Sequence, residues 1–294
     1  MSLPVRTRIT AYHAVLACAM AALGVSVTMR AWADIFEVAH DDAEYQHIFL
    51  VPLVAIFLAF VRRQRLRYAR VSGVILGPCI ALVGWMAASY GFNYRTNVLL
   101  HLGAVLVLIG CITSVVGKQV LFRFFSVAVV LLLLVPLPGG VKSLLADTLQ
   151  LWTAHICNYL LALVGVETTV FGSTLRINDQ VVMIAEACNG MRMVFPLLLI
   201  AYAFAFGLPL NNVTRYLIVL MSPFVALLCN VLRVLPLIWL QGQGPPARDW
   251  GTTLHDGSGW FMVPIAFLVL LAIIRLLKWA TVPVYRYPLA SQGA

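Results

Sequence analysis

The sequence contains little charge. Only 11% of its 294 residues are Asp, Glu, Lys or Arg, whereas 62% are hydrophobic. Soluble globular domains usually carry about 25% charged residues, so the composition excludes that class. The apolar runs are long and unbroken, which also excludes a transmembrane β-barrel with its alternating polarity. The sequence therefore predicts an all-α polytopic membrane protein, organised as one integral membrane domain over residues 1–294.

Cysteine is also scarce. Six cysteines in a chain of this length do not make a disulfide framework. Five of them lie in apolar or amphipathic runs and are expected to pack as small hydrophobic residues: Cys18, Cys79, Cys111, Cys157 and Cys229. Cys188 alone has polar neighbours on both sides. The histidines other than His255 show no shared metal-ligand spacing, so we expect no metal ion and no other cofactor.

The formal net charge is +9, but the basic residues gather in short loops between apolar runs. This distribution is typical of the cytoplasmic loops of a membrane protein and gives no reason to expect a nucleic-acid partner. The basic groups fall on alternate sides of the expected helices: Arg6 with Arg8, residues 62–70, Lys118 with Arg123, Arg215, and Arg275 with Lys278. We therefore expect a multi-pass protein with cytoplasmic N- and C-termini and an acidic loop at 34–47 that faces outward.

Apolar runs of about 17 to 25 residues are long enough to cross a bilayer. The sequence predicts eight such helices, at about 12–30, 46–61, 71–92, 98–117, 120–138, 192–207, 216–240 and 259–277. The first resembles a signal peptide that ends in Ala-Trp-Ala at 31–33. Arg30 lies just before that cleavage point, however, which favours a retained helix.

Residues 142–166 are the main ambiguity in this topology. The apolar side chains fall on one helical face and the polar ones towards the other: Leu145, Leu149, Trp152, Ile156, Tyr159 and Leu163 against Ser143, Asp147, Gln150 and Asn158. This pattern favours an interfacial amphipathic helix over a span, and a span here would invert everything after it. The next stretch, 167–185, alternates β-branched and polar residues and predicts a short extracytoplasmic extended segment.

The motif EACNGMR at 186–192 lies just before the sixth predicted helix. A cysteine near a helix N-terminus meets unpaired backbone N–H groups and the positive end of the helix dipole, which favour the thiolate. Cys188 is so placed and is the candidate nucleophile; the alternative is a cysteine that is merely buried in a loop. Arg192 lies one turn further on, and Gly190 allows close approach of a substrate or a partner helix.

Arg233 lies inside the apolar run 216–240. An arginine at the centre of a membrane helix costs about 2.5 to 3.5 kcal/mol on insertion scales, which makes it a candidate for function. Asn230, three residues earlier, is placed to orient the guanidinium. The alternative is an arginine that extends along the lipid to the outer membrane surface, about 10 Å away.

His255 lies in TTLHDGSGW, before the last predicted helix. Histidine titrates near neutral pH and exchanges protons with nucleophiles and leaving groups, although an interfacial or capping role is the simpler interpretation of one histidine alone. With Cys188 and Arg233 it supplies the nucleophile, oxyanion stabiliser and general acid/base needed for acyl transfer through a thioester. The predicted topology brings all three to the outer face of the membrane.

The motifs EACNGMR with Cys188, NVLR with Arg233 and HDGSGW with His255 resemble those of the exosortase/archaeosortase family, in the family's order. The resemblance is most specific from about 167 to 260, and Asn189 stands where the family commonly has serine. It implies a membrane-embedded cysteine transpeptidase with its active site on the extracytoplasmic face of the bacterial inner membrane. Its substrates would be exported proteins that end in a short motif such as Pro-Glu-Pro, a transmembrane helix and a basic tail, and it would pass them to an acceptor.

In this hypothesis Arg192 binds the sorting signal or tunes the thiolate, and the acidic residues Asp41, Asp42 and Glu44 shape the entrance to the site. Two other classes of function stay open. An intramembrane arginine and a polar loop are also typical of a transporter, although the sequence shows no clear inverted repeat. The third class is a non-catalytic membrane component of envelope polysaccharide export.

Overall fold

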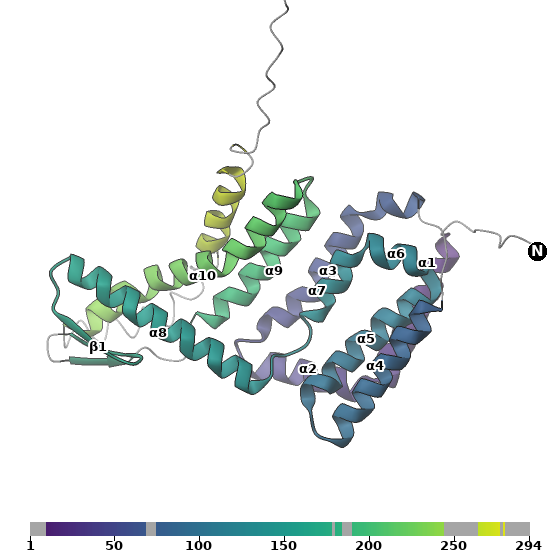
Figure 1. Ribbon diagram of the computed structural model, residues 1–294, viewed down its shortest axis with the longest axis horizontal. Coiled ribbons are helices and arrows are strands. Elements are labelled where there is room, and N and C mark those ends of the chain that lie inside the picture. Colours follow the sequence, from purple (N-terminus) through teal and green to yellow (C-terminus); the bar gives the residue numbers. More distant parts are fainter. Residues whose placement is uncertain are drawn as a thin grey trace, which may run out of the picture.

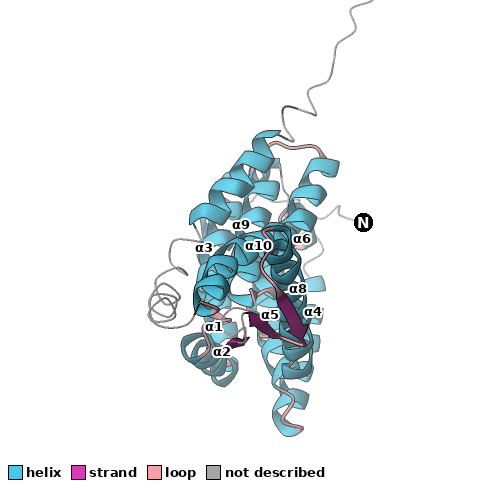
Figure 2. Ribbon diagram, turned by 90° about the vertical axis from the view of Figure 1, so that its left-hand side faces the viewer, coloured by secondary structure: helices cyan, strands magenta, loops and turns pink. Residues whose placement is uncertain are grey.

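The computed structural model describes residues 10–68, 75–177, 180–183, 190–243, 264–276 and 279. Most of these residues are helical, and one small antiparallel sheet accompanies the helices (Figure 1; Figure 2). The apolar runs of the sequence form helices because a helix satisfies every backbone polar group within its own segment, as a bilayer requires. The fold is thus the predominantly helical one that the composition predicts.

Two of the described helices are long and apolar enough to cross a membrane: α5 (Asn97–Val116) and α10 (Asn212–Gln241). A third candidate is α1 (Ala11–Val27) taken together with α2 (Met29–Asp41), which are bent by 80° at the break between them. The shorter apolar helices are Gln46–Val61, α9 (Met191–Gly207) and Pro264–Leu276. The described residues therefore contain two or three clear spans, and the prediction of eight spans is confirmed only in part.

The N-terminal half departs from the predicted boundaries in two places. The expected acidic loop at 34–47 is largely helical, because α2 continues to Asp41. Ala31, Trp32, Ile35 and Ala39 share one face of α2 at helical spacing and are buried, which stabilises the helix despite its acidic residues. The predicted helix at 120–138 is divided into α6 (Lys118–Arg123) and α7 (Phe125–Leu132).

The helix α4 (Leu76–Asn93) lies along α5 over its whole length (Figure 1). A Cβ atom added to Gly84 would lie 2.7 Å from the backbone N of Val107, and one added to Gly103 would lie 2.4 Å from the backbone N of Ala88. Small residues therefore let the two backbones touch, as in tightly packed membrane helices.

The 3₁₀ helices η1 (Gln46–Leu50) and η2 (Arg63–Tyr68) flank α3 (Val51–Val61). η1 and α3 pack with α2, α5, α7 and α9 in the largest apolar core.

The C-terminal half combines α8 (Gly139–Leu163), α9 and α10 with the sheet. Its strands are β1 (Thr168–Phe171), β2 (Thr174–Ile177) and β3 (Gln180–Met183), paired antiparallel in that order. The buried side of β2, with Leu175 and Ile177, packs against α8 and α10. The stretch predicted to be extended is therefore extended, and its position outside the membrane stays a prediction.

The helix α8 runs across the direction of α3, α7 and α9 (Figure 1). The face predicted to be apolar is largely exposed, including Trp152 and Tyr159. The opposite side packs on the protein through Thr153, Ala154 and Cys157. An exposed apolar face on a helix that crosses the others supports its predicted place at a membrane surface.

Candidate functional site

The helix α9 begins at Met191, and Gly190 caps it in the left-handed conformation with φ 88° and ψ −11°. A side chain is strained in that conformation, and a Cβ atom added here would lie 3.3 Å from Nδ2 of Asn230. Gly190 therefore serves both the turn and the close approach to α10. The approach places the chain two residues after Cys188 against the middle of α10.

Asn230 and Arg233 lie one helical turn apart on α10, and both are buried. The Nδ2 of Asn230 donates a hydrogen bond to Oγ1 of Thr153 on α8, at 3.4 Å. Arg233 is only 6% exposed, so protein encloses its guanidinium. This burial disfavours the alternative in which Arg233 runs along lipid to the membrane surface. An arginine enclosed within a membrane protein is expected to face a partner or a site.

The second part of the site is the acidic turn, defined here as residues 42–47, between α2 and α3. Lys142 on the first turn of α8 forms an ion pair with Asp42 and a second with Glu44, whose Oε2 lies 3.1 Å from Nζ. The hydroxyl of Tyr45 donates to the carbonyl oxygen of Leu137 at 3.1 Å. These contacts attach the acidic turn to the start of α8.

The acidic turn also reaches the start of α9. The ring of His47 stacks on Phe195, with ring centroids 4.8 Å apart and planes inclined by 16°. Its Nδ1 lies 3.1 Å from the carbonyl oxygen of Glu44. Because a carbonyl only accepts, Nδ1 carries the proton in this bond and Nε2 of the neutral ring is left as an acceptor. The first turn of α9 is therefore bordered by an aromatic stack that includes a histidine.

The charges of this cluster reinforce one another. Burial raises the pKa of the Asp42 carboxyl, but hydrogen bonds from Lys142 and from the Glu44 backbone N–H outweigh it and hold the pKa below its usual 3.8. The positive charge of Arg192 acts in the same direction. Burial lowers the pKa of Lys142, but its bonds to Asp42 and Glu44 more than compensate and raise it above 10.5. Asp42 and Lys142 are thus both charged at neutral pH.

The structure brings together four of the seven residues that the sequence singles out. Gly190 and Asn230 are in direct proximity, Arg233 follows on the next turn, and Arg192 lies exposed on α9 within electrostatic range of Asp42. The remaining three lie outside the described residues: Cys188, Asn189 and His255.

Sequence reasoning places Asp41, Asp42 and Glu44 at the entrance but misses the residues that hold them. Lys142 lies 100 positions from Asp42. His47 and Phe195 lie in separate apolar runs, and Thr153 is an ordinary position on an amphipathic helix. The one available signal was that Lys142 is the single basic residue between Arg123 and Arg176, in a chain that otherwise groups its basic residues.

Comparison with protein families gives one match. The model of the family described as "Transmembrane exosortase (Exosortase_EpsH)" matches residues 32–272, a range that includes Cys188, Arg233 and His255. Searches of curated proteins and of solved structures gave no match. The match extends over most of the 294 residues, so it covers the N-terminal half from residue 32 onward as well as the three motifs. This protein belongs to the transmembrane exosortase family.

Proposed function

We propose that this protein is a membrane-embedded cysteine transpeptidase that cleaves the C-terminal sorting signals of exported proteins through a thioester intermediate. The substrates carry a short motif, a transmembrane helix and a basic tail, and the cleaved protein passes to an acceptor nucleophile. The reaction takes place on the extracytoplasmic face of the bacterial inner membrane. Membership of the exosortase family and the chemistry of Cys188, Arg233 and His255 support this proposal.

The observation that carries it is the contact between Gly190 and Asn230. The contact joins the segment that follows Cys188 to the part of α10 that carries the buried Arg233. These positions are about 40 residues apart in the sequence, and a nucleophile and an oxyanion stabiliser need to lie within reach of one carbonyl group. Gly190 is the residue type that permits the approach.

In the proposed mechanism the Cys188 thiolate attacks the carbonyl carbon of the scissile peptide bond, and Arg233 stabilises the negative charge on the carbonyl oxygen. Collapse of the intermediate breaks the C–N bond, and His255 gives a proton to the departing amine. His255 then takes a proton from the acceptor as it attacks the thioester, which releases Cys188. The positive end of the α9 helix dipole, together with the charge of Arg192, favours the thiolate.

The acidic turn suits a role at the entrance. It joins the start of α8 to the start of α9 and holds Asp42 within electrostatic range of Arg192. We propose that Arg192 binds an acidic residue of the sorting signal beside this turn, so that the site selects substrates by charge.

The experiment is to replace Cys188 by alanine and to follow an epitope-tagged exported protein with a C-terminal motif, helix and basic tail from the same genome. We expect the uncleaved precursor to accumulate in the membrane. Cys157→Ala is the matched control, because Cys157 is a buried thiol on α8 whose pKa is raised by burial to about 12. Normal processing by the Cys188→Ala protein would rule out the thioester mechanism and favour a transporter or a scaffold.

A further inference from the structure

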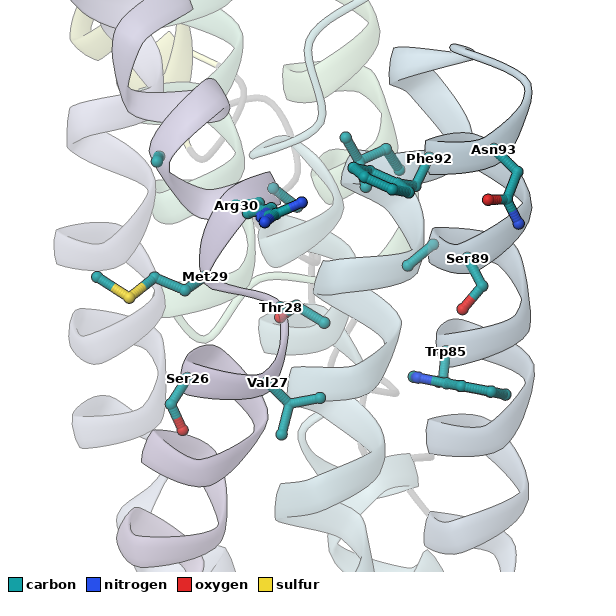
Figure 3. Close-up of a pocket in the computed structure, with 13 residues that line it drawn as sticks. Ser26, Val27, Thr28, Met29, Arg30, Trp85, Ser89, Phe92 and Asn93 are labelled. Atoms are coloured by element: carbon teal, nitrogen blue, oxygen red, sulfur yellow. The ribbon is translucent and has the colours of Figure 1, made fainter.

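A second region, away from the acidic turn, has the features of a ligand site. A cavity of about 690 Å³ lies at the elbow between α1 and α2, and α4 forms its other wall. Figure 3 shows Arg30, Phe92 and Asn93 towards one end of this cavity and Val27 and Trp85 towards the other. We call it the elbow cavity.

The walls of the elbow cavity change in polarity along its length. Asn93, Ser89 and Trp85 follow one another at intervals of four residues on α4, so they line one face of the helix in that order. On the opposite wall the chain runs from Arg30 to Val27. One end therefore offers a guanidinium, an amide and a hydroxyl, and the other end offers an indole ring and aliphatic carbon.

Arg30 is the charged group of this cavity. Its guanidinium lies 5.5 Å from the centre of the Phe92 ring, and it forms no ion pair with any residue that the structure describes. Asp34, one turn further along α2, is engaged by His101, with its Oδ2 2.5 Å from Nε2. Arg30 thus brings to the cavity a positive charge that has no ion-pair partner among the described residues.

The other polar groups at the elbow are satisfied within the protein. The hydroxyl of Thr28 donates to the carbonyl oxygen of Gly24 at 2.8 Å and accepts a bond from Trp32 Nε1 at 3.0 Å. The hydroxyl of Ser26 donates to Leu23 at 2.9 Å. These groups bind their own helices, which leaves the polar end around Arg30 as the place for a ligand.

The topology predicted from the sequence places this polar end at the outer membrane boundary, and the helix lengths agree with it. The 17 residues of α1 and the 18 of α4 correspond to about 26 and 27 Å, close to the thickness of about 30 Å of a hydrocarbon core. Both helices end at the elbow cavity, and α2 turns away by 80°. On that topology Arg30 and Asn93 belong at headgroup level, and the exposed surfaces of Val27 and Trp85 belong at the level of acyl chains.

We infer that the elbow cavity binds an anionic phospholipid, with the phosphate beside Arg30 and Asn93 and an acyl chain between α1 and α4 along Val27 and Trp85. A single cation at headgroup level matches a phosphodiester, and the apolar end matches the chain attached to it. A free phosphate ion would leave the apolar end empty. A zwitterionic lipid would place its own cation near Arg30.

The test measures binding of short-chain phosphatidylglycerol to the purified full-length protein in neutral detergent. Phosphatidylethanolamine and inorganic phosphate are the comparison ligands. Arg30→Gln removes the charge, and Ser89→Phe fills the cavity but keeps the charge. Arg95→Gln is the matched control, because Arg95 lies just beyond α4 at the same membrane boundary but outside the cavity lining.

We expect Arg30→Gln and Ser89→Phe each to weaken phosphatidylglycerol binding at least tenfold, and Arg95→Gln to change it less than twofold. Arg30→Lys keeps a cation and should retain most of the binding. If Arg30→Gln fails to fold, Arg30→Lys and Ser89→Phe together still test the inference. Full binding by Ser89→Phe would show general charge attraction and overturn the inference. Equal binding of phosphatidylethanolamine, or displacement of the lipid by inorganic phosphate, would also overturn it.

Discussion

Replacement of Lys142 by methionine is predicted to release the acidic turn from α8. The lysine bonds to both Asp42 and Glu44, and the three side chains are 27%, 33% and 11% exposed. An exposed salt bridge contributes about 0.2 to 1 kcal/mol, and a hydrogen bond to a charged group contributes about 1.5 to 3 kcal/mol. Partial exposure places this pair of contacts between those values, at about 1 to 2 kcal/mol. Opening of the turn should therefore become about 5 to 30 times more frequent.

Hydrogen exchange at the backbone amides of residues 43–47 measures this opening directly. Protection should fall by the same factor in Lys142→Met and should stay near the wild-type value in Lys142→Arg. Lys118→Met is the charge-matched control, because Lys118 is exposed at the start of α6 and contacts no part of the acidic turn. Unchanged protection in Lys142→Met would show that the ion pairs do not hold the turn, and the assignment of the entrance would then be wrong.

The difference in amide protection between wild type and Lys142→Met depends on pH with a definite sign. The pKa of Asp42 is lowered in the folded protein. The stability that Asp42 contributes is therefore present above pH 3.8, its usual pKa, and is lost as the pH falls through the folded pKa. The pKa of Lys142 is raised in the folded protein. The stability that Lys142 contributes is therefore present below pH 10.5, its usual pKa, and is lost as the pH rises through the folded pKa. The difference in protection between wild type and Lys142→Met should therefore be constant from about pH 5 to pH 9.

Two further substitutions test the junction of α9 with α10. Gly190→Ala forces a side chain into the left-handed conformation, which costs about 1 to 2 kcal/mol, and directs that side chain towards Asn230. Cleavage by this variant should slow at least tenfold. Gly139→Ala is the control and should leave cleavage unchanged, because no atom lies within 4 Å of a Cβ added at Gly139. Arg233→Met should lower the cleavage rate by about 10²- to 10³-fold at equal protein level, with Arg215→Met as the control on the same helix. More than a tenth of normal activity in Arg233→Met would contradict an oxyanion role.

Helix positions were predictable where a long apolar run determines them. The predicted runs 98–117 and 216–240 correspond to Asn97–Val116 and Asn212–Gln241, because length and hydropathy leave a bilayer segment few alternatives. The acidic residues at 34–47 concealed α2, whose stability comes from burial of Trp32 and Ile35 against other helices. Hydropathy does not register such tertiary contacts.

The site was predictable only in part, for the same reason. The sequence places Gly190 at a helix start and pairs Asn230 with Arg233, since both relations are local. Lys142 stands out as an isolated basic residue, but the sequence does not identify Asp42 as its partner or Thr153 as the acceptor for Asn230, because these contacts join distant segments. These two contacts both involve one helix, α8.

Both contacts depend on α8 being one continuous helix, which has 25 residues. Lys142 and Thr153 are 11 positions apart, which is three turns, so they project from the same side of α8 about 16 Å apart. Lys142 holds the acidic turn and Thr153 binds Asn230, so the helix fixes the distance between these two borders of the site. An extended peptide advances about 3.3 Å per residue, and a gap of this width admits four to five residues of a sorting signal. The exposed apolar face with Trp152 and Tyr159 would keep this spacer at the membrane surface, where the transmembrane helix of the proposed substrate would end.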